Sequence, residues 1–187
     1  AGPAAPMAAA GRRVFVALRS SSLVAVDVDT GELAWRAALG VVHAPALAGD
    51  RLVVVTPETA EAVSVATGES LWRVPLSSPP ATGAHVVKGA AVVALTSGDV
   101  LALEIEHGAS RWKAALGGPA AGAATSDVAT LYFALDDGRV VALRAADGSR
   151  AWEQRLGGRP TGLTVPAARL HAGALHNSFY PPEPSPG

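Results

Sequence analysis

The sequence predicts an all-β protein, a β-propeller built from four-stranded antiparallel blades. Its four tryptophans recur at nearly equal spacing, and each follows a glycine by four residues and precedes a leucine by four. A period of about 40 residues is typical of repeat architectures, in which each unit buries its faces against its neighbours. We therefore expect about four repeats and a degenerate fifth. The structural repeat positions are Gly31 and Trp35, Gly68 and Trp72, Gly108 and Trp112, and Gly148 and Trp152, and the units end near Leu39, Leu76, Leu116 and Leu156.

The segment before each glycine predicts the third strand of its unit. In the last unit, Val141 and Leu143 fall on one face and Ala142 and Arg144 on the other, which is the period of two that strands show. The turns D-T-G, A-T-G, E-H-G and A-D-G then place glycine where a hairpin needs a positive φ. The fourth strand contains the tryptophan and ends near the leucine.

Another apolar segment upstream predicts the second strand of each unit. These segments span residues 14–18, 52–55, 91–95 and 131–135, and tight polar turns join them to the third strands. Segments rich in small residues, such as HAPALAGD and AAGAATSD, precede the later ones. Small side chains suit an innermost strand at a crowded axis. The first unit has no obvious innermost strand.

The repeats divide the chain into three parts. Residues 1–11 are expected to be a flexible lead-in, residues 12–175 the repeats, and residues 176–187 a proline-rich tail or truncated fifth repeat. Gly187 follows Gly148 by nearly one full period, where a repeat glycine belongs. Either the chain belongs to a longer propeller, or it ends in a decayed repeat that serves as a cap or linker.

An unpaired blade edge must be covered, and three ways of covering it are compatible with the sequence. Residues 161–165 would close a four-bladed ring by supplying the first unit with its innermost strand. Two copies would instead pair edge to edge into an eight-bladed ring. The third cover is a different protein docked on the open edge.

The composition of the chain bears on its partners. With 17% charged residues and a net charge of -1, it lacks the concentrated basic surface that nucleic-acid binding requires. No apolar run approaches the roughly 18 residues of a transmembrane helix. Cysteine is absent, which excludes disulfides and thiolate metal sites within this sequence.

The carboxylate and histidine side chains that could take part in catalysis or metal binding are expected to have structural roles. Asp27, Glu104 and Glu106 lie in or beside third strands, but in different repeat frames, so we expect solvated strand or turn residues. The histidines are also expected to be structural or at the surface. His43 and His85 are out of register with each other and His107 is a turn residue, while His171 and His176 have no carboxylates at metal-ligand spacing. We expect no catalytic, cofactor-binding or metal-binding residues. The break in the pattern at Ser-Ser-Pro-Pro, residues 77–80, predicts a stiff connector in preference to a ligand-facing loop.

One motif resembles a known family. The pattern A-x-D-x-x-T-G-x-x-x-W is similar to the tryptophan-docking motif of PQQ-like (quinoprotein-type) propeller repeats, and the first unit matches it at Ala25, Asp27, Thr30, Gly31 and Trp35. Later units keep glycine and tryptophan but replace the aspartate. The resemblance covers roughly residues 12–165.

The resemblance implies function only broadly. The dehydrogenases of this family hold pyrroloquinoline quinone with calcium, an acidic base and commonly a vicinal disulfide, and this cysteine-free chain has no such disulfide. Other family members are scaffolds of outer-membrane protein assembly. We therefore expect a non-enzymatic bacterial scaffold for protein–protein interaction, without cofactor, in the periplasm or another extracytoplasmic compartment. Its partner would be a different protein or a second copy that covers an open blade edge.

Two alternatives remain open. One is a fragment of a PQQ-dependent quinoprotein oxidoreductase, with PQQ and calcium, whose catalytic residues lie outside this chain. The other is the sensor propeller of a signalling protein.

Overall fold

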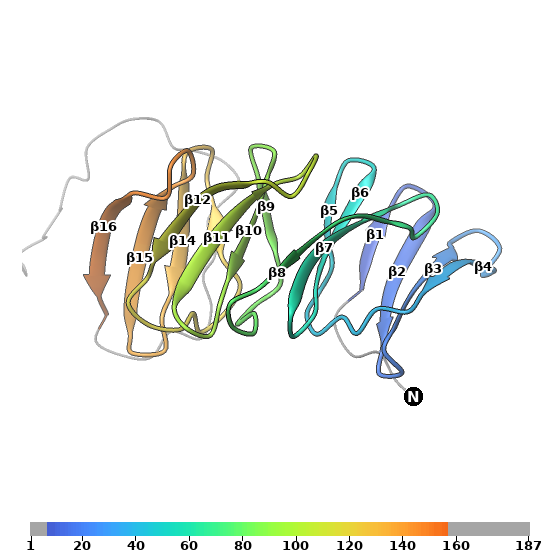
Figure 1. The fold of residues 1–187 in the computed structure, drawn as a ribbon, viewed down its shortest axis with the longest axis horizontal. Helices are drawn as coiled ribbons and strands as arrows, with labels where there is room; N and C mark the ends of the chain where they lie inside the picture. The colour runs from blue at the N-terminus through green and yellow to red at the C-terminus, as the bar shows by residue number, and fades with distance from the viewer. Residues whose placement is uncertain (1–6, 157–187) are drawn as a thin grey trace, which may run out of the picture.

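The computed structural model describes residues 7–156, which form four antiparallel sheets of four strands each and contain no helix. Figure 1 shows the sheets side by side in chain order, with β4 at one end and β16 at the other. This arrangement is that of a partial β-propeller, so the predicted fold class is confirmed. The expected fifth repeat and Gly187 lie outside the described residues. So does the segment 161–165.

Each sheet is a blade whose strands pair in chain order, from innermost to outermost. The first blade holds β1 (Ala8–Ala10), β2 (Arg13–Leu18), β3 (Ser22–Asp27) and β4 (Leu33–Ala37). The second holds β5 (Ala46–Ala48), β6 (Arg51–Val55), β7 (Thr59–Ser64) and β8 (Ser70–Pro75). The third holds β9 (His85–Val87), β10 (Ala90–Ala94), β11 (Asp99–Glu104) and β12 (Ser110–Ala115). The fourth holds β13 (Thr125–Ser126), β14 (Thr130–Ala134), β15 (Arg139–Arg144) and β16 (Arg150–Arg155).

The first blade does have an innermost strand. Ala8–Ala10 pairs antiparallel with β2, and Ala8 lies opposite Phe15. This strand falls inside the segment expected to be a lead-in, and it removes the need for residues 161–165 to complete the blade. β1 lies next to β5, and β5 lies next to β9. An all-alanine strand suits this position because the innermost strands approach one another closely.

The third and fourth strands of every blade share one irregularity. Their register shifts directly after an alanine, at Ala25, Ala62, Ala102 and Ala142. In the third blade Ala102 lies opposite Trp112 and Leu103 opposite Ser110, so the strand carrying the tryptophan has one extra residue. A β-bulge of this kind redirects a side chain. Here it lies beside the tryptophan in every blade.

The tryptophans of the first three blades each cover the glycine turn of the next blade. A Cβ built on Gly148 would lie 2.4 Å from the nearest ring atom of Trp112, closer than real Cβ contacts. The same contact joins Trp35 to Gly68 and Trp72 to Gly108, at 2.5 and 2.8 Å. Only a glycine fits beneath these rings, and each of the three glycines also has a positive φ that disfavours side chains.

A hydrogen bond fixes each of these rings. The indole N–H of each tryptophan donates to the carbonyl three residues before the covered glycine. The distances are 3.0 Å from Trp35 to Val65, 2.7 Å from Trp72 to Ile105 and 3.1 Å from Trp112 to Ala145. A buried indole N–H needs such a partner.

Around these contacts lie three apolar cores, one between each pair of neighbouring blades. In the core between the third and fourth blades, Val92 and Trp112 of one blade pack with Phe133 and Leu143 of the other. Alternate residues of a strand point to opposite faces, so the second and third strands contribute to the cores on both sides of their blade. No helix in residues 7–156 has the length and apolar character needed to cross a membrane.

We predict that Trp112→Ala lowers the free energy of unfolding by about 3–5 kcal/mol, because it leaves a cavity and an unpaired carbonyl at Ala145. Urea denaturation followed by circular dichroism would measure the loss. Trp152→Ala is the matched control, since Trp152 is 46% exposed whereas Trp112 is 9% exposed. Equal losses in the two variants would contradict the role assigned to the inter-blade ring.

A pair of alanine substitutions separates backbone strain from steric contact. Gly31 and Gly148 have φ of 73° and 72°, but a Cβ on Gly31 would meet nothing within 4 Å. We expect Gly31→Ala to cost about 1 kcal/mol from the left-handed backbone alone. Gly148→Ala should cost about 3 kcal/mol because it also overpacks against Trp112. The difference in urea midpoint between the two variants tests this expectation.

Candidate functional site

One end of the blade stack presents exposed apolar side chains of the fourth blade. Trp152 is 46% exposed, whereas the other three tryptophans are 8–9% exposed. Leu156 is also exposed, although its counterpart in the third blade, Leu116, is fully buried. Among residues 7–156, no carbonyl accepts a hydrogen bond from the Trp152 indole. The fourth blade thus carries the docking residues of an inter-blade contact, and residues 7–156 hold no glycine turn beneath them.

Tyr132 lies beside the Trp152 ring. The two ring centroids are 5.8 Å apart, and the rings are tilted by 41°. The Tyr132 hydroxyl donates a 2.7 Å hydrogen bond to Asp127. Burial and this hydrogen bond raise the pKa of Tyr132. Burial alone would raise the pKa of Asp127, but hydrogen bonds from Tyr132 and from two backbone amides hold it below its ordinary value. The hydroxyl is therefore satisfied within its own blade.

The opposite end of the stack is the outer face of the first blade. Phe15 and Leu23 point into the core shared with the second blade, so the alternate residues of β2 and β3 point outward. The outward set is apolar, and it consists of Val14, Val16, Val24 and Val26. Val14 lies opposite Val26, and Val16 opposite Val24. Val28, next in the series and three residues before Gly31, is 50% exposed.

This outward face matches the buried faces of the other blades. In the fourth blade the equivalent residues are Leu131, Phe133, Val141 and Leu143, all fully or almost fully buried against the third blade. Their pairing is the same, with Leu131 opposite Leu143 and Phe133 opposite Val141. In the first blade, Val14, Val16 and Val26 are only half-buried. The first blade thus has the accepting half of an inter-blade interface.

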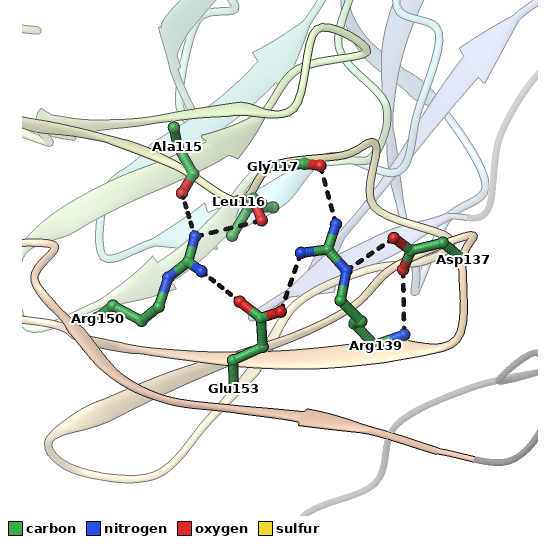
Figure 2. Close-up of polar contacts among 7 residues, drawn as sticks. All are labelled: Ala115, Leu116, Gly117, Asp137, Arg139, Arg150 and Glu153. Atoms are coloured by element: carbon green, nitrogen blue, oxygen red, sulfur yellow. Dashed lines mark hydrogen bonds and ion pairs between the residues drawn. The ribbon is translucent and has the colours of Figure 1, made fainter.

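A polar clamp ties the fourth blade to the third (Figure 2). Glu153 lies between Arg139, at 3.0 Å, and Arg150. Arg139 also donates to the carbonyl of Gly117 at 2.8 Å, and Arg150 to the carbonyl of Ala115 at 2.9 Å. Hydrogen bonds to Glu153 and Asp137 raise the pKa of Arg139. Both arginines therefore bind backbone carbonyls at the end of the preceding blade, in addition to the shared carboxylate.

The corresponding place between the second and third blades is hollow. A groove of about 290 Å³ is lined by Ser77, Asp99, Leu101, Lys113, Ala114 and Ala115. Asp99 occupies the position that Arg139 has one blade later, and Lys113 that of Glu153. The shorter aspartate leaves open the volume that the Arg139 guanidinium fills in the clamp.

A buried carboxylate distinguishes the second blade. Glu61 is 1% exposed and accepts hydrogen bonds from Arg73 at 2.9 and 3.2 Å, while 59% of the Arg73 side chain is exposed. The hydrogen bond to Glu61 raises the pKa of Arg73. In the other blades this strand position holds Val24, Leu101 or Val141. Sequence reasoning missed Glu61, although aligning the repeats would have exposed it as a charge at an apolar position.

The structure does not bring Asp27, Glu104 and Glu106 together into one site. Asp27 accepts hydrogen bonds from the amides of Thr30 and Asp29 in its own turn, and these bonds lower its pKa. Glu104 faces Arg111 at 3.8 Å, and Glu106 pairs with Arg51 at 2.8 Å. Within residues 7–156, no three His, Asp or Glu side chains lie close enough together to hold a metal ion.

Two of the described histidines, His85 and His43, make contacts between blades or connectors. His85 lies 2.8 Å from the Ser126 hydroxyl and so joins the innermost strands β9 and β13, and burial lowers its pKa. His43 contacts the carbonyl of Pro80 at 3.1 Å. His107 lies in the turn before Gly108. His171 and His176 lie outside the described residues.

The Ser-Ser-Pro-Pro connector does not break the repeat. Pro80 forms a β-bridge with Leu95, and Ala120 forms the same bridge with Leu135 one blade later. The amide of Ala81 donates to the carbonyl of Ala94 at 2.8 Å. These bonds tie residues 77–82 to the next blade. This geometry is that of the connector expected here, but the segment follows the repeat and does not break it.

The Glu61–Arg73 pair predicts an asymmetry between two variants. Glu61→Val should leave the urea midpoint unchanged or raise it, because it restores the apolar residue of the other blades and leaves Arg73 able to reach water. Arg73→Ala should lower the midpoint, because it leaves a buried carboxylate unpaired.

The double variant is the control for this pair. Adding Glu61→Val to Arg73→Ala should recover the lost stability. A midpoint that falls more for Glu61→Val than for Arg73→Ala would contradict the assignment of the carboxylate as the costly partner.

Known proteins resemble this chain in sequence and in fold. The family described as outer membrane protein assembly factor BamB matches residues 1–61 and 57–176. No curated protein sequence gives a significant match.

Solved structures share the fold. BamB from Moraxella catarrhalis superposes with a TM-score of 0.70 at 24% identity, covering 80% of this chain and 47% of that chain. Quinohemoprotein alcohol dehydrogenase from Comamonas testosteroni gives 0.70 at 16% identity, covering 82% and 35%. The computationally designed Ika4 protein gives 0.68 at 15% identity, covering 76% and 91%. The chain thus spans less than half the length of the matched BamB structure. At these identities the likenesses show the fold alone.

Proposed function

Because the chain belongs to the family of outer membrane protein assembly factor BamB, we propose that it is a non-enzymatic β-propeller scaffold for protein–protein interaction. We place it in the periplasm, or another extracytoplasmic compartment, of a bacterial cell. Its partners are proteins that take part in outer membrane protein assembly. It requires no cofactor for this role.

The exposed ends of the blade stack carry the proposal. Trp152 and Val28 are each about half exposed, although their counterparts between blades are buried or partly buried. Clusters of exposed apolar side chains of this kind mark protein interaction sites. The carboxylates Asp27 and Glu106 are engaged in structural contacts. Asp27 accepts hydrogen bonds from the backbone amides of its own turn, and Glu106 pairs with Arg51.

A quinoprotein oxidoreductase is the second candidate, favoured by the likeness of the fold to quinohemoprotein alcohol dehydrogenase. Calcium binding by the quinone site of such an enzyme requires clustered oxygen ligands. Among residues 7–156, no three His, Asp or Glu side chains cluster in this way. Under this candidate the site residues lie outside the described part of the chain.

Binding measurements separate the two candidates. We expect the purified chain to bind purified outer membrane protein assembly components with a saturable heat signal in isothermal titration calorimetry. Titration with pyrroloquinoline quinone and calcium should leave the tryptophan fluorescence unchanged. The thermally unfolded chain is the control for non-specific binding. A saturable quinone response without binding to the assembly components would overturn the scaffold in favour of the oxidoreductase.

A further inference from the structure

The three interfaces inside the stack follow one rule. The earlier blade contributes a tryptophan, and the later blade contributes a glycine without a Cβ and a carbonyl three residues before it. The rule has a direction, because none of the four described blades uses its tryptophan toward the preceding blade. Within residues 7–156 the four blades therefore form three complete interfaces, and two halves have no counterpart among these residues.

These two halves lie at opposite ends (Figure 1). At one end, Trp152 and Leu156 have no glycine turn to cover among the described residues. At the other end, Gly31 has open space where its counterparts meet a tryptophan ring. Val28 supplies the carbonyl that corresponds to that of Ala145, and no group in residues 7–156 donates a hydrogen bond to it. The two halves are complementary in shape and in hydrogen bonding.

We propose that a second copy of this chain joins these halves, with Trp152 of one copy covering Gly31 of the other. The Trp152 indole then donates to the carbonyl of Val28, as Trp112 does to that of Ala145. This inference deepens the proposed function and rests on it, because it adds a second copy of the chain, bound at the blade ends, to the partners of the scaffold. The contact is heterologous, so it closes into a ring or continues as a filament according to the rotation between copies.

The apolar surroundings of both halves fit this contact. The valine face of the first blade occupies the place of Leu131, Phe133, Val141 and Leu143, which fill the interface before the fourth blade.

On the face of the fourth blade that carries Trp152, Tyr132 replaces Val92 of the third blade. The Tyr132 hydroxyl already donates to Asp127, so covering the ring leaves no polar group unpaired. The first blade shows that an aromatic residue fits here, since Phe15 at the same position packs on Trp35 with centroids 5.8 Å apart.

Sedimentation of the full chain alone, over a range of concentrations, tests the proposal. We expect a reversible dimer or a larger assembly. Three variants should each weaken it at least about tenfold in Kd: Trp152→Ala removes the ring, Val28→Asp charges the accepting face, and Gly31→Ala places a Cβ beneath the ring. Leu71→Asp is the matched control, because Leu71 is 47% exposed on the second blade, away from both ends. It should leave the assembly unchanged.

Acrylamide quenching provides a second measurement in the same samples. At low concentration one quenchable tryptophan should be present, and Trp152→Phe should remove it. At concentrations that favour the assembly, this tryptophan of the unaltered chain should become protected.

A chain that stays monomeric at every concentration would overturn the proposal, as would an assembly that the three variants leave intact or that Leu71→Asp also disrupts. The measurement uses no other protein, so a monomer would not affect binding to assembly components. Failure of that binding would likewise leave the sedimentation result standing.

Discussion

The contact between an indole ring and a glycine turn organises this structure. Two independent requirements fall on the same glycine: its φ is positive, and a Cβ at this position would lie only 2.4–2.8 Å from the nearest atom of a tryptophan ring. The ring in turn needs an acceptor for its N–H, which the same turn supplies three residues earlier. Because one short segment meets all these requirements, blades of different sequence stack in the same relative position.

The polar contacts differ from one inter-blade interface to the next. Between the third and fourth blades, Arg139 and Arg150 bind backbone carbonyls of the preceding blade and share the Glu153 carboxylate. The same place one interface earlier is a groove with Asp99 and Lys113. The second blade carries a buried Glu61 where others have aliphatic side chains. These differences leave the apolar contact intact, since the ring, its hydrogen bond and the glycine turn are present at all three interfaces.

The periodicity of the sequence was sufficient to predict the blades, their four-strand order and the partial propeller, because period-two strands and glycine turns recur at fixed spacing. It was insufficient for β1, since three alanines carry neither periodicity nor β-propensity, and only pairing with β2 and proximity to β5 define that strand. The connector at residues 77–80 was expected, but its place in the repeat was missed for a similar reason: its regularity lies in a β-bridge, which different residues form one blade later. At the candidate site, the repeat frame identified Trp152 but not its exposure. The clamp arginines have no sequence signal, because their partners are backbone carbonyls.

The direction of the tryptophan contact has a consequence for how repeats can be added or lost by gene duplication. Each repeat unit carries a ring for its successor and a receptive turn for its predecessor. Tandem duplication of one such unit within the gene inserts a blade whose two faces already match its new neighbours, and loss of a unit in frame brings together faces that also match. The number of blades can therefore change by whole units without new interfaces having to evolve. The groove, the clamp and the buried carboxylate lie outside this shared contact and differ from blade to blade.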